Sequence, residues 1–115
     1  IEILPNIKIN HEMLEKAASL GYSTATDLAD YLAKQGVPFR EAHEIVGKIV
    51  ALAISKKKSL HELDLQDYRS IHPDIDEKII SVASLQSSVQ SKNTFGGTST
   101  NEVKKQIEAA RKLLA

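Results

Sequence analysis

The sequence predicts an all-α fold, a compact orthogonal multi-helix domain packed around one central buried helix from about Pro38 to Ile54. The strongest indication is the apolar side of that segment, which covers an arc of roughly 200° when residues are placed 100° apart. An ordinary surface helix shows an apolar stripe of only ~100°. A second indication is the series of helix start and stop signals along the rest of the chain. Other segments must therefore cover the central helix from several directions.

Ile49 lies near the middle of the apolar arc, so we expect its side chain to be fully buried. The opposite side of the helix carries charges, and Glu44 and Lys48 have the i,i+4 spacing that favours an ion pair. Gly36 and Pro38 mark the corner before this helix, since glycine ends helices and proline suits their first turn. The apolar residues of the arc are Phe39, Ala42, Ile45, Val46, Ile49, Val50, Leu52, Ala53 and Ile54.

The chain before this corner predicts an extended arm followed by two helices. Ile1 to Ile9 alternates apolar and polar residues around Pro5, which favours an extended lead-in over a strand. Asn10 is a plausible N-cap for a helix to about Leu20, ended by Gly21. Its expected inner face is Met13, Leu14, Ala17 and Ala18.

The next helix begins at Ser23 or Thr24, and Thr24 with Asp27 has the spacing of a capping box. Its apolar residues are expected to face inward and its charged residues outward. The inward set is Ala25, Leu28, Ala29, Tyr31 and Leu32, and the outward set is Asp27, Asp30 and Lys34.

After the central helix, short helices are expected, because a capping residue is followed three positions later by a carboxylate at three places. These pairs are Ser59 with Glu62, Asp64 with Asp67, and Asp74 with Glu77. The polar stretch Ser81 to Thr100 is expected to be mostly irregular, with one helical turn near Ser84 to Val89. Ser99 with Glu102 then caps a final helix, whose apolar seam is Val103, Ile107, Ala110 and Leu114.

Composition restricts the class of protein. The 115 residues suit a single domain, residues 1–115, of which residues 1–9 form the lead-in arm. Fifteen basic and fifteen acidic residues balance to zero, which argues against nucleic acid or a membrane surface as partner. There is no cysteine, no apolar run of membrane-spanning length and no signal peptide, a pattern typical of a cytoplasmic protein. The first residue is not methionine, so we expect an excised piece of a longer protein.

The four histidines do not predict a metal site, because no pair has the i,i+4 spacing of a helical zinc site. His43 lies on the apolar arc, where we expect a partly buried, hydrogen-bonded core histidine and not a proton donor or acceptor. The other three, His11, His61 and His72, fall at helix starts and in loops.

Three further features are interpreted as structural. Gly96 to Ser99 precedes a helix and can bind an anion, but without a following lysine a turn and N-cap explain it better. Lys56 to Lys58 is expected to be a solvated helix end. The carboxylate pairs Asp27 with Asp30, and Glu41 with Glu44, are expected to be solvated. No nucleophile–base pair is apparent, so no catalytic, cofactor-binding or metal-binding residue and no cofactor is predicted.

One resemblance is specific and runs along essentially the whole chain. The strings TATDLADYL and GVPFREAHEIVGKIVALA, and GGT at Gly96 to Thr98, resemble the C-terminal domain of argininosuccinate lyase, in the fumarase/aspartase superfamily. The sequence departs from that family at Ser84, where an acidic residue is usual, and at Lys92, where arginine is usual. These changes put an ion pair between the two places in doubt.

The resemblance implies a parent homotetramer that cleaves argininosuccinate to arginine and fumarate by β-elimination, in arginine biosynthesis. The family's serine loop, GSSxMPxKxN, is absent here, so no catalytic residue carries over and the fragment is expected to be inactive alone. It implies packing against the catalytic domains of the same parent chain, with closure of the active site as a further role. The alternative is a stand-alone helical protein-interaction module that uses the Ile1 to Ile9 arm or the final helix.

Overall fold

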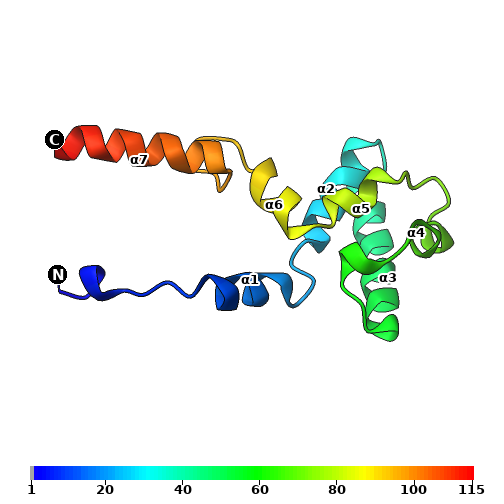
Figure 1. The fold of residues 1–115 in the computed structure, drawn as a ribbon. Coiled ribbons are helices and arrows are strands. Elements are labelled where there is room, and N and C mark those ends of the chain that lie inside the picture. The colour runs from blue at the N-terminus through cyan, green and yellow to red at the C-terminus, as the bar shows by residue number, and fades with distance from the viewer. Residues whose placement is uncertain (1) are drawn as a thin grey trace.

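The computed structural model describes residues 2–115, and these contain helices and no strand (Figure 1). The all-α prediction is therefore confirmed. The α-helices are α1 His11–Ser19, α2 Ala25–Lys34, α3 Phe39–Lys56, α4 Leu65–Ile71, α5 Lys78–Val82, α6 Leu85–Ser91 and α7 Thr100–Leu114. Two 3₁₀ turns, η1 Leu4–Asn6 and η2 Leu60–Glu62, complete the elements.

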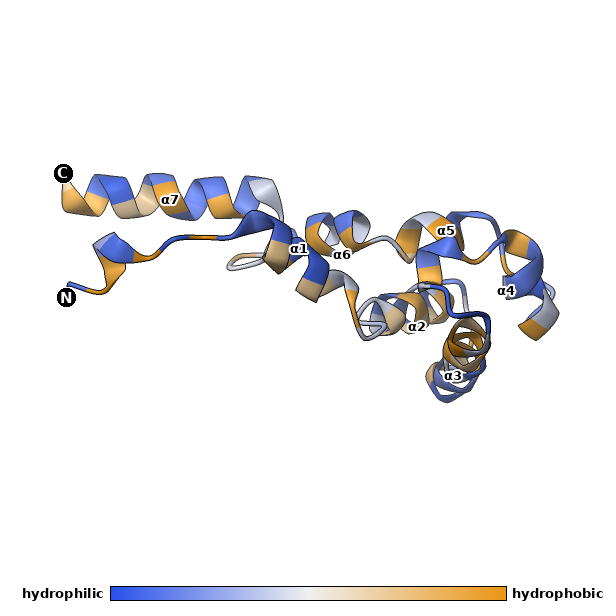
Figure 2. Cartoon of the chain, turned by 60° about the horizontal axis from the view of Figure 1, so that its bottom comes forward, coloured by the Kyte–Doolittle hydropathy of each residue, from blue (hydrophilic) through white to orange (hydrophobic). Residues whose placement is uncertain are grey.

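Helix α3 is the centre of the globular part, as the apolar arc predicts. Ile49 is completely buried, whereas Lys48 on the opposite side is exposed. In Figure 2, which views α3 nearly along its axis, the hydrophobic residues lie toward the other helices and the hydrophilic ones outward. The buried core consists of Leu28, Ala29, Leu32, Ala42, Ile45, Val46, Ile49, Ala53, Leu60, Leu63, Tyr68, Ile75, Ile79 and Ala83.

The corner between α2 and α3 has the geometry predicted for Gly36 and Pro38. Gly36 takes φ +99°, a backbone angle that residues with a side chain rarely adopt. The N–H of Val37 donates to the carbonyl of Leu32 at 3.1 Å. Pro38 is the N-cap of α3, and its carbonyl accepts the N–H of Ala42 at 2.8 Å. This closed corner packs α2 directly onto the apolar side of α3.

Both ends of the chain project from the same side of the globular part (Figure 1). The arm with α1 and the C-terminal α7 extend the molecule to 55 × 29 × 21 Å. The prediction that α1 turns an apolar face inward is wrong for this chain. Met13 is 58% and Leu14 60% exposed, and α1 contains no buried residue. The predicted compact domain therefore corresponds to the part from α2 to α6. The arm predicted to be extended contains the turn η1.

Several local predictions are confirmed. Asn10, Asp64 and Ser99 each accept a hydrogen bond from the backbone N–H three residues later. Ser59 and Glu62 form a complete capping box. These caps succeed because they depend only on neighbours within one helical turn.

Other local predictions are wrong. Thr24 is the N-cap of α2 but makes no side-chain cap bond. Asp74 and Glu77 do not start a helix together, because α5 begins at Lys78, whose N–H donates to Asp76. The helical turn expected near Ser84 to Val89 is present but longer, as the seven-residue helix α6, which Ser84 caps by accepting the N–H of Ser87.

Candidate functional site

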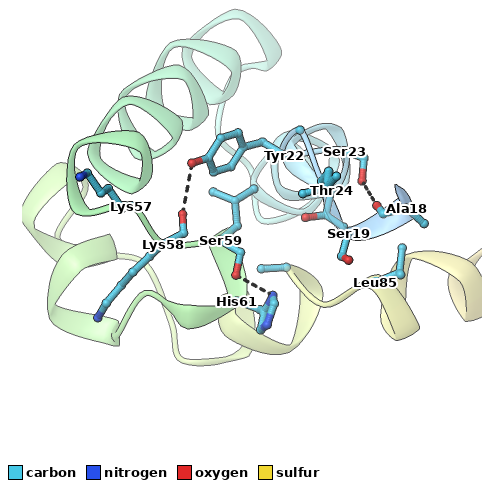
Figure 3. A pocket seen from close by; sticks show the side chains of 14 residues that line it. Ala18, Ser19, Tyr22, Ser23, Thr24, Lys57, Lys58, Ser59, His61 and Leu85 are labelled. Atoms are coloured by element: carbon cyan, nitrogen blue, oxygen red, sulfur yellow. Dashed lines mark hydrogen bonds between the residues drawn. The ribbon is translucent and has the colours of Figure 1, made fainter. Parts of the chain in front are cut away.

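A groove of about 380 Å³ lies where three parts of the chain meet (Figure 3). One wall is the turn between α1 and α2, the second is the end of α3 with η2, and the third is the junction of α5 and α6. The lining residues include Leu20, Tyr22, Thr24, Ser59, His61 and Leu85.

Two residues with left-handed backbone shape this groove. Tyr22 has φ 57° and Lys57 has φ 54°, a conformation that is uncommon for residues other than glycine. Lys57 ends α3, after which the N–H of Lys58 bonds the carbonyl of Ala53 at 3.0 Å. The hydroxyl of Tyr22 donates to the carbonyl of Lys58 at 3.2 Å, which ties the first two walls together (Figure 3).

The groove contains a serine–histidine contact that sequence reasoning missed. Ser59 Oγ lies 3.2 Å from His61 Nδ1 (Figure 3), but it also donates to Glu62 Oε2 at 2.6 Å. Because the hydroxyl proton is directed at the carboxylate of the capping box, His61 does not act as its base. Ser59 therefore acts with Glu62 as the cap of η2 and is not activated by His61.

A second polar cluster lies between α2 and α6, and it corrects the outward orientation predicted for Asp27. The side chain of Asp27 is only 11% exposed, and Lys92 Nζ donates to its Oδ1 at 2.6 Å. The hydroxyl of Ser88 donates to Oδ2 at 2.6 Å. Burial raises the pKa of Asp27, but the hydrogen bonds from Lys92 and Ser88 and the charge of Lys92 outweigh it and lower the pKa below its ordinary value.

Lys92, the departure from the family pattern, is therefore the partner of a carboxylate on α2, whereas Ser84 is the N-cap of α6. Lys92 does form an ion pair, and its partner is Asp27 and not residue 84. Sequence reasoning missed the pair because the two residues are 65 positions apart.

The other charged candidates are distributed over the surface. Lys56, Lys57 and Lys58 are all exposed, as expected, and Lys56 also forms an ion pair with Asp67 of α4. Glu44 pairs with Arg40 and not with Lys48 as the spacing suggested. Asp30 and Glu41 are exposed, as expected.

The histidines are far from one another along the chain and form no cluster. His43 is exposed with its ring 4.6 Å from that of Phe39, so the core position predicted for it is wrong. Phe39 itself is 60% exposed and Ile54 57%, so the edge of the predicted arc that they share with His43 is not covered. His11 and His61 are exposed, and His72 is partly buried with Nδ1 unpaired.

No group of three or more histidine, aspartate or glutamate side chains within residues 2–115 is arranged to bind a metal ion. None of the helices described here is both long and apolar enough to cross a membrane. Gly96 to Ser99 forms a hydrogen-bonded turn and the N-cap of α7, consistent with the structural interpretation.

These features define a small all-α domain whose polar side chains cap helices and join them. A sequence profile described as argininosuccinate lyase C-terminal matches residues 22–90, which is the globular part of this structure. This chain belongs to the argininosuccinate lyase C-terminal family.

Full-length relatives support this assignment. The argininosuccinate lyase of Bartonella bacilliformis is 46% identical over 91% of this chain, and argininosuccinate lyase 1 of Mesorhizobium japonicum is 48% identical over 98%. That of Nitratiruptor sp. is 47% identical over 98% of the chain. The matched region is 23%, 24% and 25% of these relatives respectively, so this chain spans about a quarter of their length.

Proposed function

We propose that this chain is the C-terminal domain of an argininosuccinate lyase, whose parent protein cleaves argininosuccinate to arginine and fumarate in arginine biosynthesis. The support is the family assignment together with similarity to relatives that carry this name. The domain comprises residues 1–115, contributes no catalytic residue and needs no cofactor. The parent is a cytoplasmic homotetramer that binds neither nucleic acid nor membrane.

The distribution of exposed apolar side chains supports the proposal that this chain docks against the rest of a larger protein. Most large ones lie on the two projecting ends and not on the globular part: Ile3, Leu4, Ile7, Ile9, Met13, Leu14, Leu20, Val103, Ile107, Leu113 and Leu114. Soluble monomers rarely expose such an apolar area without a partner. We propose that these ends dock against the catalytic part of the same parent chain, with residues 1–9 leading in from it.

The first experiment concerns the chain alone. Purified chain is mixed with argininosuccinate, and fumarate release is followed by ultraviolet absorbance. We expect no turnover above a blank without protein, because the family's serine loop lies outside these residues. Turnover by the chain would contradict the proposal that it has no catalytic residue.

The second experiment tests docking in the longer protein. Ile107→Glu places a charge on the apolar seam of α7, where Ile107 is 46% exposed, and is expected to weaken assembly and lower lyase activity. Lys104→Glu, at an exposed position outside the predicted seam, is the matched control and should leave both nearly unchanged. Equal assembly and activity for the two variants would show that α7 does not dock.

A further inference from the structure

The side chain of Lys92 ties the end of α6 to α2. Its Nζ bonds Asp27 Oδ1 at 2.6 Å, and Ser88 of α6 bonds the other carboxylate oxygen at the same distance. Asp27 is nearly buried, whereas the lysine side chain is 49% exposed. A charge-assisted bond to a largely desolvated carboxylate is stronger and more directional than a surface ion pair.

The backbone of the same residue holds the start of α7. The carbonyl of Lys92 accepts the N–H of Ser99, the N-cap of α7, at 3.0 Å. A Cβ on Gly97 would lie 2.1 Å from that carbonyl oxygen, so any other residue there must open the turn. The N–H of Gly97 also bonds the carbonyl of Thr94 at 2.8 Å.

Additional bonds between α6 and the start of α7 reinforce this turn. The side-chain amide of Gln90 donates to Thr100 Oγ1 at 2.7 Å and accepts the backbone N–H of Thr100 at 3.3 Å. The hydroxyl of Thr98 donates to the carbonyl of Val89 at 3.1 Å. The end of the stretch expected to be mostly irregular is therefore a turn between α6 and α7 that hydrogen bonds hold in place.

Helix α7 has little other attachment. Its 15 residues extend about 22 Å from this corner. Glu102, in the first turn, is its only buried residue within the described part of the chain. The direction of α7 must therefore be set at its base.

We propose that Lys92 is a positioning residue that fixes the direction in which α7 leaves the globular part. Its side chain is joined to α2 and its backbone to α7, so one residue transmits the orientation of the globular part to the helix. This goes beyond the proposed function, because it concerns the geometry of the chain itself and holds whatever α7 binds.

The absence of cysteine from the sequence allows a direct test by spin labelling. Nitroxide labels are placed on the 115-residue chain with Lys48→Cys on α3 and Glu108→Cys on α7, both at exposed positions. Pulsed electron spin resonance then gives the distribution of distances between the labels. We expect one narrow distribution for the otherwise unchanged chain, and a broad distribution would overturn the proposal.

Variants of Lys92 test its role. Lys92→Met, which removes the ammonium, is expected to broaden the distribution at least twofold, and Lys92→Arg to keep it narrow because a guanidinium also bonds Asp27. Lys104→Met, at an exposed site on α7, removes the same charge and should change nothing. A distribution for Lys92→Met as narrow as that of the unchanged chain would overturn the proposal.

Two other variants decide the question if Lys92→Met fails to give cooperative unfolding by circular dichroism. Asp27→Asn weakens the bond to the side chain of Lys92. Gly97→Ala leaves that bond intact and displaces Ser99 from the Lys92 carbonyl. Both are expected to broaden or shift the distribution, and no change in either would refute the assignment.

Discussion

Replacement of Ile49 by alanine tests the packing around α3. Ile49 is completely buried, so the substitution removes about three carbon atoms from the core, worth ~0.8 kcal/mol each or about 2.4 kcal/mol in transfer free energy. Incomplete collapse around the cavity adds to this, and similar substitutions cost ~2–5 kcal/mol. The expected loss is therefore a large fraction of the ~5–15 kcal/mol that stabilises a typical domain.

The assay is urea unfolding followed by circular dichroism. With a slope of ~1–3 kcal/mol per M, Ile49→Ala should lower the midpoint by about 1–3 M. Lys48→Ala, at the neighbouring exposed position, is the control and should change the free energy of unfolding by less than ~0.5 kcal/mol. Equal midpoints for the two variants would show that the helical phase assigned to α3 is wrong.

Three further predictions concern stability. Gly47→Ala should stabilise the chain by ~0.5–1 kcal/mol in urea unfolding, because Gly47 is mid-helix and an added Cβ meets nothing within 4 Å; a destabilised variant would contradict this. Burial raises the pKa of Tyr68 to about 12, so the unfolded state loses this proton first and stability should fall as pH rises from about 10. Tyr68→Phe also loses the 2.7 Å hydrogen bond to the Leu60 carbonyl, at a cost of ~0.5–1.5 kcal/mol. The stability of this variant should fall less at alkaline pH, and an unchanged dependence of stability on alkaline pH would contradict the pKa assigned to Tyr68. The pKa of Asp27 is lowered in the folded chain, so its stabilisation is complete above its unfolded pKa of ~3.9 and is lost as pH falls further. Asp27→Asn should therefore flatten the acid side of the stability profile, and equal slopes for variant and unchanged chain would argue against the ion pair.

Short-range features of the fold were predictable from the sequence. The phase of α3, the burial of Ile49 and the corner at Gly36 all follow from spacing within a few residues. The caps at Asn10, Ser59, Asp64 and Ser99 are equally local, since each joins a side chain to a backbone group three positions away.

The sequence by itself thus determined the positions of α1, α2, α3 and α7 and which side of α3 is apolar, because side-chain periodicity records local geometry. It did not determine whether an apolar face is covered, and so the inner face expected for α1 is exposed in the structure. Only the tertiary structure decided that Asp27 meets Lys92, because a contact across 65 positions depends on the paths of all the helices between them. The same long-range packing places the exposed ends on one side of the molecule.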